Sequence, residues 1–212
     1  MHETRELVVL VHGLWMNRPV MSVLAHRLRR AGYHTALFGF HSALHPYAQH
    51  LRNFAAFLGA AQREDRAVHC VGHSMGGVLI LDVLARNPDL DIARVVALGS
   101  PLRGSLGSQQ FMRHAFGRIC IGASADLWQS FPALRCPEGV DVGVIAGTER
   151  IGLGRFFTDL PDPNDGVVTV EETRLDDLTD HLVLPVSHMG MLFAREVADQ
   201  TMRFLRTGSF GR

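Results

Sequence analysis

The amino-acid sequence predicts an α/β fold, a three-layer sandwich in which a mostly parallel sheet of about six strands has helices on both faces. Two observations predict this fold. Short apolar runs rich in β-branched residues alternate along the chain with segments whose apolar residues recur at helical spacing. The runs are continuously apolar, which is typical of strands that are covered on both faces. Strand–helix–strand alternation implies right-handed crossovers, and these produce parallel strands.

Six apolar segments fit the strands of this sheet: Leu7–Val11, Thr35–Phe40, Ala67–Val71, Ala93–Leu98, Val142–Ala146 and Leu182–Leu184. The segments between them fit crossover helices. The first helical pattern runs from Val20 to Leu28, with Pro19 at its first turn and Gly32 past its end, an asymmetry typical of helices. Later helical patterns cover residues 46–61, 78–85 and 191–205.

The chain of 212 residues is long enough for one domain with a substantial core, and it contains no repeat and no linker. We therefore expect a single domain over residues 1–212. The segment 103–135 is long and interrupts the strand–helix alternation. It has two interpretations, a small helical cap and an ordinary crossover helix with its loops.

The charge composition excludes several classes of function. The 21 basic residues, all of them Arg, balance 21 acidic residues, so we expect no nucleic-acid partner. The absence of Lys excludes mechanisms that need a side-chain amine, such as a Schiff base. We also expect no cofactor. No apolar stretch approaches ~18 residues and no signal-peptide pattern is present, so we expect a cytoplasmic protein without integral membrane association. The composition does not specify an oligomeric state.

A serine between a strand and a helix is the sharpest motif in the chain. Residues 72–77 read Gly-His-Ser-Met-Gly-Gly, directly after the strand 67–71 and directly before a helical pattern. A tight strand-to-helix turn holds its central residue in a strained conformation, and glycines two residues before and after it let the flanking chains pass. Such a turn lifts the Ser74 hydroxyl above the sheet, as a nucleophile requires.

The tetrahedral intermediate formed by such a serine needs two hydrogen-bond donors. One is the backbone N–H of Met75, the residue after the nucleophile. The loop after the first strand reads His-Gly-Leu-Trp at residues 12–15, and Gly13 allows a turn that aims the Leu14 N–H at the same place. We therefore predict an oxyanion hole formed by these two N–H groups, with Trp15 and Met16 lining the substrate groove.

Twelve histidines compete for the role of general base. A base for a nucleophile at the carboxyl edge of a parallel sheet must itself follow the carboxyl end of a strand. His188 does so, whereas His181 precedes the same strand and is expected roughly 10 Å or more away, at ~3.3 Å per residue. His12 and His73 lie too close in sequence to the oxyanion loop and to Ser74 to serve. The prediction is that His188 takes the serine proton and returns it to the leaving group.

Three further histidines, His41, His45 and His50, raise the question of a metal site. Their spacing spans a loop and the start of a helix, with no Cys or carboxylate in step. Zinc sites need four ligands, or three and a water, from such residue types. We expect solvated surface histidines here and no metal.

The general base needs a carboxylate that orients it. The candidates after the strand 142–146 are Glu149, Asp159, Asp162 and Asp165. Asp141 precedes that strand and is expected at the opposite edge. Asp165 stands in a tight turn, Pro-Asn-Asp-Gly at residues 163–166, where a side chain is held rigidly. We favour Asp165 as the acid, with Glu149 as the alternative.

The order Ser–Asp–His on a strand–turn–helix serine is that of the α/β-hydrolase superfamily, which the chain resembles. Four motifs are similar to those of small bacterial lipases and esterases: Val-His-Gly-Leu-Trp (11–15), Gly-His-Ser-Met-Gly-Gly (72–77), Gly-Ser-Pro (99–101) and Asn-Asp-Gly-Val-Val (164–168). The likeness runs from Leu7 to Leu205, and the first strand leads directly to the oxyanion loop, as in a minimal version of the fold. The Gly-Gly-rich oxyanion motif of some lipases is absent.

The resemblance implies a serine carboxylester hydrolase that acylates Ser74 and is deacylated by water. Its substrate would be a small-molecule or lipid acyl ester. Leu102 and Met189 join Trp15 and Met16 as apolar residues expected to line the site and to favour a hydrophobic acyl group. Three alternatives stay open: a thioesterase, an acyltransferase with the same triad, and a non-catalytic binding member of the fold.

Overall fold

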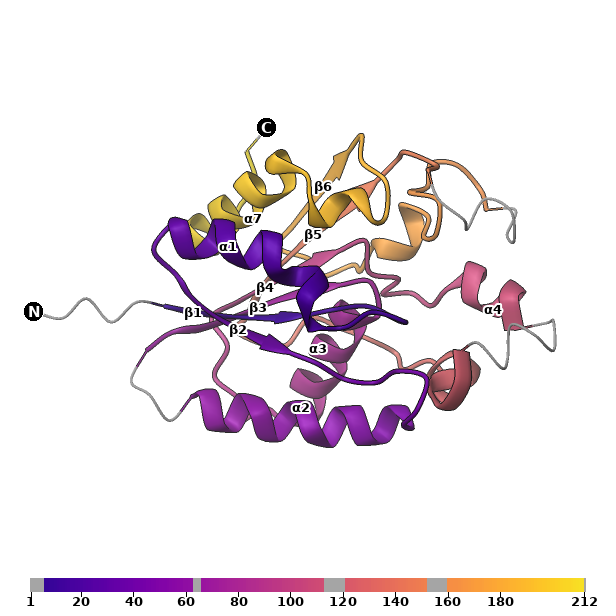
Figure 1. Ribbon diagram of the computed structural model, residues 1–212, viewed down its shortest axis with the longest axis horizontal. Helices are drawn as coiled ribbons and strands as arrows, with labels where there is room; N and C mark the ends of the chain where they lie inside the picture. The colour runs from indigo at the N-terminus through magenta and orange to yellow at the C-terminus, as the bar shows by residue number, and fades with distance from the viewer. Residues whose placement is uncertain (1–5, 63–65, 113–120, 152–159, 212) are drawn as a thin grey trace, which may run out of the picture.

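The computed structural model describes residues 6–62, 66–112, 121–151 and 160–211, and its centre is one sheet with strand order β2-β1-β3-β4-β5-β6 (Figure 1). All neighbouring strands are parallel. The strands are β1 (Leu7–Val11), β2 (His34–Phe38), β3 (Val68–His73), β4 (Arg94–Leu98), β5 (Asp141–Gly147) and β6 (Asp180–Leu184). The predicted α/β sandwich is confirmed, and predicted strand ends differ from these by one or two residues or not at all.

Helices cover both faces of the sheet (Figure 1). The helices are α1 (Ser22–Arg30), α2 (Tyr47–Ala61), α3 (Met75–Arg86), α4 (Leu106–Met112), α6 (Ala125–Gln129) and α7 (Arg195–Thr207). Side chains of β1 alternate between two cores: Val8 and Leu10 pack with α1 and α7, whereas Val9 and Val11 pack with α2 and α3. Each such side chain stabilises the fold by about 1.5–3 kcal/mol, so both faces contribute.

The start of the last helix was wrongly placed by the sequence pattern. Met191 and Leu192 belong to a short 3₁₀ helix, Gly190–Leu192, and Ala194 has extended backbone angles (φ −64°, ψ 133°) that break the helical path. The helix therefore begins at Arg195. It ends at Thr207 because Gly208 adopts the left-handed conformation (φ 73°) that terminates many helices.

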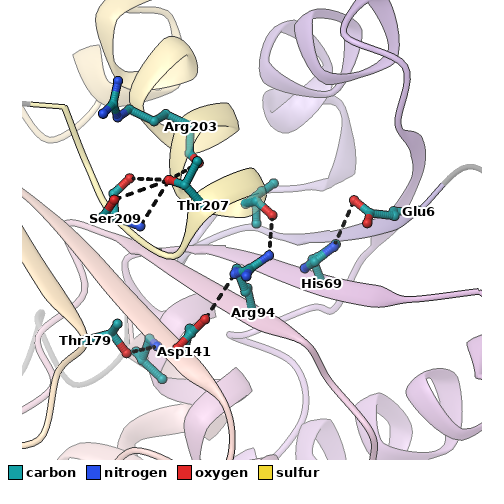
Figure 2. A network of polar contacts seen from close by, with 10 residues as sticks. Glu6, His69, Arg94, Asp141, Thr179, Arg203, Thr207 and Ser209 are labelled. Carbon is teal, nitrogen blue, oxygen red and sulfur yellow. Dashed lines mark hydrogen bonds and ion pairs between the residues drawn. The ribbon is translucent and has the colours of Figure 1, made fainter.

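A polar network holds the amino edge of the sheet together (Figure 2). The Arg94 guanidinium in β4 donates to the Asp141 carboxylate in β5 at 3.1 Å and to the Leu205 carbonyl in α7 at 2.9 Å. His69 in β3 places its Nε2 3.3 Å from the Glu6 carboxylate. These contacts attach the end of α7 to the amino edge of the sheet. The loops that follow the strands lie at the opposite, carboxyl edge.

The segment 103–135 connects β4 to β5, and its described part contains the short helices α4 and α6 together with irregular loops. Asp126 in α6 accepts a hydrogen bond from the Tyr47 N–H at the start of α2, at 3.3 Å. Leu127 and Trp128 are buried, so this part packs into the fold. By contrast, α4 lies beyond the carboxyl edge of the sheet (Figure 1). No helix within the described ranges is long and apolar enough to cross a membrane.

Candidate active site

Ser74 occupies a strained turn between β3 and α3. Its backbone angles (φ 55°, ψ −126°) are rarely adopted by a residue with a side chain and cost about 1–3 kcal/mol. The turn closes tightly, because a Cβ on Gly72 would lie 2.5 Å from the Gly77 nitrogen. The Ser74 N–H donates to the Leu98 carbonyl at the end of β4, at 2.8 Å. The side chain is half-buried, and its hydroxyl makes no hydrogen bond with another described residue.

Asp165 lies nearly fully buried at the same edge of the sheet. Its Oδ1 accepts the N–H groups of Val167 and Val168 at 2.9 and 2.7 Å, which fixes the carboxylate in its turn. The neighbouring Asn164 side chain accepts the Gly166 N–H at 3.0 Å and supports the same turn. The second carboxylate oxygen, Oδ2, is thereby left to face a different partner.

That partner is His188, whose Nδ1 lies 2.7 Å from Asp165 Oδ2. A carboxylate oxygen accepts, so Nδ1 carries the proton and Nε2 carries the lone pair. The His188 N–H also donates to the Asp165 carbonyl at 3.0 Å, which locks the two residues together through the backbone. The pair is arranged as a base with its orienting acid.

The Asp165–His188 pair lies directly beside the serine turn. A Cβ on Gly99, the residue after Leu98, would lie 3.0 Å from Asp165 Oδ2 and 3.2 Å from His188 Nδ1. Gly99 has φ +54° and leaves this space empty. The His188 ring also packs against the ring of His73, with centroids 4.6 Å apart. The serine turn and the Asp165–His188 pair thus lie together at the carboxyl ends of β3 and β4, and a side-chain hydrogen bond joins the histidine to the aspartate.

The competing acids and bases lie elsewhere or have other partners. Glu149 is exposed. His181 lies at the start of β6, where its Nε2 contacts the Thr173 hydroxyl at 2.8 Å and burial lowers its pKa to about 4. Asp162 pairs with Arg150 at the surface. Asp159 lies outside the described residues.

The expectation of three solvated histidines was wrong for His50. Its exposed fraction is 1%, it packs on Phe40 with ring centroids 4.8 Å apart, and burial lowers its pKa to about 4. The reason is the helical phase of α2, which turns this residue inward with Phe54 and Leu58. His41 and His45 are exposed, as expected. No group of three or more potential metal ligands occurs among the residues that the structure describes.

The loop after β1 lies directly against the serine. A Cβ on Gly13 would lie 2.9 Å from Ser74 Cβ. The His12 Nδ1 is 2.9 Å from the Gly13 carbonyl and its Nε2 accepts the Phe40 N–H at 3.3 Å, so Nδ1 is the donor to that carbonyl. This contact fixes the peptide unit between Gly13 and Leu14.

Both predicted oxyanion donors are free to bind an anion. The Leu14 N–H and the Met75 N–H have no acceptor among the described residues, and Met75 is the first residue of α3, whose opening N–H groups have no partner within the helix. The next amide along the loop, that of Trp15, donates to Ser42 Oγ at 3.1 Å. Met75 directly follows Ser74 in the chain, and Leu14 follows Gly13, whose backbone lies against the Ser74 side chain.

The four residues expected to line the substrate groove have different environments. Trp15 and Met189 are exposed (58% and 43%), Met16 is half-buried against the core of α1 and α7, and Leu102 is buried in the core of α2 and α3. Leu102 therefore does not face solvent in this conformation. Further exposed apolar side chains lie in the segments that follow the strands, a position that could have identified them: Leu44, Leu106 at the start of α4, Ile151 and Phe193.

Comparisons with known proteins extend these observations. A family model described as the alpha/beta hydrolase family matches residues 8–201. A crystallised Bacillus licheniformis lipase in its mature form has a TM-score of 0.74 at 20% identity, covering 97% of this chain and 93% of the lipase. A metagenomic carboxyl esterase has a TM-score of 0.69 at 21% identity, covering 89% of this chain and 66% of the esterase. No sequence among the curated proteins matches.

Proposed function

The chain belongs to the alpha/beta hydrolase family, and from this premise we propose that it is a serine hydrolase that cleaves carboxylic esters through an acyl-enzyme on Ser74. The observation that carries the proposal is the 2.7 Å contact between His188 Nδ1 and Asp165 Oδ2. It gives His188 the tautomer in which Nε2 can accept the serine proton. The lipase and the carboxyl esterase among the similar structures support an ester substrate.

The reaction begins at the strained turn. Ser74 Oγ attacks the ester carbonyl carbon while His188 Nε2 takes its proton, and Asp165 stabilises the imidazolium that results. The carbonyl oxygen becomes an oxyanion, which the N–H groups of Leu14 and Met75 stabilise by two hydrogen bonds. When the tetrahedral intermediate collapses, the carbon–oxygen bond to the alcohol breaks and the imidazolium protonates the leaving alkoxide.

Deacylation repeats the same steps with water as the nucleophile. His188 removes a proton from the water, the hydroxide attacks the acyl carbon, and Ser74 leaves with the proton that the imidazolium returns. Exposed apolar side chains in the surrounding loops, such as Trp15 and Met189, favour a hydrophobic acyl group over a charged one.

The proposal is tested by ester turnover. The purified protein is expected to hydrolyse p-nitrophenyl butyrate, and Ser74→Ala is expected to abolish turnover without unfolding the protein. Product analysis with an added alcohol or thiol would show whether the acyl group also passes to acceptors other than water. A wild-type protein that is folded but does not turn over any of a chain-length series of activated esters and thioesters would contradict the proposal.

A further inference from the structure

His73, the residue directly before the serine, is the buried histidine that the proposed mechanism does not use. It is the last residue of β3, and its exposed fraction is 0%. Its Nε2 lies 2.9 Å from the backbone carbonyl of His188. A carbonyl oxygen only accepts, so this nitrogen carries the proton and donates.

The remaining features of His73 indicate a neutral ring. Burial lowers its pKa to about 3, so it stays uncharged near neutral pH. Its Nδ1 has no hydrogen-bond partner among the described residues, which costs free energy that an apolar residue at this buried position would not incur. The one polar contact that the side chain makes there is the one to His188.

That hydrogen bond connects two parts of the site, the loop that carries the base and the strand that precedes the nucleophile. His188 is hydrogen-bonded to Asp165 by its ring and its N–H, and both of these bonds lie within the loops after β5 and β6. Among the hydrogen bonds of the described ranges, the one from His73 is the bond that links the loop of the base to the strand that ends directly before Ser74. The ring packing at 4.6 Å further restricts rotation of the His188 imidazole.

We propose that His73 is a positioning residue, which holds the backbone and ring of His188 at the distance and orientation that proton transfer from Ser74 requires. This inference rests on the proposed serine hydrolase function. His73 does not touch the substrate or transfer a proton itself. It acts through His188, and because it is adjacent to Ser74 in the chain it couples the position of the base to that of the nucleophile.

The test compares glutamine and asparagine at position 73, whose side-chain amide nitrogens lie at different distances from Cβ. The Gln Nε2 stands as many bonds from Cβ as the His Nε2 does, whereas the Asn amide is one bond shorter. His73→Gln therefore keeps the donor to the His188 carbonyl, and His73→Asn and His73→Phe lose it. Because misplacement of a reacting group by about 1 Å can lower the rate about 100-fold, we expect kcat for p-nitrophenyl butyrate to fall about 10- to 100-fold in the latter two, with KM nearly unchanged. His73→Gln should recover most of the loss.

His69 is a matched control. It lies on the same strand, is equally buried, and contacts Glu6 at the opposite edge of the sheet (Figure 2). His69→Phe and His69→Asn should lower the free energy of unfolding, measured in urea, and leave kcat near the wild-type value. The Gln–Asn comparison at position 73 serves as the decisive pair if His73→Phe does not fold.

The outcomes separate the two proposals. If the wild type is active and the His73→Asn and His73→Gln variants have equal kcat, or if the His69 variants lose as much kcat at equal stability, the positioning role is overturned and the serine hydrolase function stands. If the folded wild type is inactive towards the whole ester and thioester series, the proposed function fails and the positioning role fails with it. Loss of kcat in His73→Asn with recovery in His73→Gln supports both.

Discussion

Gly13 offers the most direct test of the oxyanion loop, through the substitution Gly13→Ala. The new Cβ would lie 2.9 Å from Ser74 Cβ and 3.3 Å from both Nδ1 and the carbonyl oxygen of His73. Two carbon atoms prefer a separation of about 3.5–4.0 Å, so the loop must move away from the serine by roughly half an ångström or more. The Leu14 N–H is in the next peptide unit and moves with it.

The expected effect follows from that displacement. Removing one oxyanion donor costs about 100- to 1,000-fold in kcat, and a displaced donor should cost about 10- to 100-fold. KM should change little, because the donor acts in the transition state more than in the ground state. The added methyl group also overpacks a buried site, which should lower the free energy of unfolding by about 1–3 kcal/mol.

Gly59→Ala is the matched control for this substitution. Gly59 lies inside α2, and a Cβ there would meet nothing within 4 Å. Alanine in a helix interior is favoured over glycine by about 1 kcal/mol, so this variant should be more stable and equally active. The assay is steady-state hydrolysis of p-nitrophenyl butyrate together with urea unfolding. A Gly13→Ala protein that is less stable but keeps wild-type kcat would refute the assignment of the Leu14 N–H as an oxyanion donor.

Three further predictions follow from the buried polar groups. Asp165→Asn should lower kcat about 1,000- to 10,000-fold by favouring the wrong tautomer of His188, whereas Glu149→Gln should leave kcat unchanged; equal losses would contradict the choice of acid. The Glu172 carboxylate accepts two backbone N–H groups at 2.5 and 2.7 Å, and Glu172→Gln turns one acceptor into a donor, so the free energy of unfolding should fall by about 1–3 kcal/mol. Burial lowers the pKa of His73 to about 3 in the folded protein. As the pH falls from about 6.5 towards 3, His73 therefore becomes protonated in the unfolded chain but stays neutral in the folded one. Stability should decline in this window by up to about 1.4 kcal/mol per pH unit, and urea unfolding at pH 7 and pH 5 should show a smaller decline for His73→Gln.

The sequence pattern predicted the architecture because local signals specify it. Continuous apolar runs and helical spacing mark the strands and the crossovers, and the glycines at 72, 76 and 77 mark the serine turn. The same local signals failed where the orientation of a side chain depends on helical phase, or where a bend in the backbone sets the start of a helix. His50 faces the core although its neighbours His41 and His45 are exposed, and the closing helix starts at Arg195 because Ala194 is extended.

Contacts between distant segments explain what the sequence pattern did not predict. The preference for Asp165 over Glu149 rested on the rigidity of a turn, and the contact with His188 that distinguishes them joins residues 23 positions apart. The contact between His73 and the His188 carbonyl joins residues 115 positions apart, and no periodicity or motif in the sequence predicts it. Leu102 was expected to line the site as an apolar residue, and its burial in the core of α2 and α3 is set by packing between distant segments.

The central claim is that His188 activates Ser74 as a nucleophile. The most direct measurement is the rate at which a fluorophosphonate modifies the protein, followed by intact-mass spectrometry and peptide mapping. One adduct on Ser74 is expected in the wild type, with a rate that falls by orders of magnitude in His188→Ala. A folded wild type that is not modified, an adduct on another residue, or an unchanged rate in His188→Ala would contradict the claim.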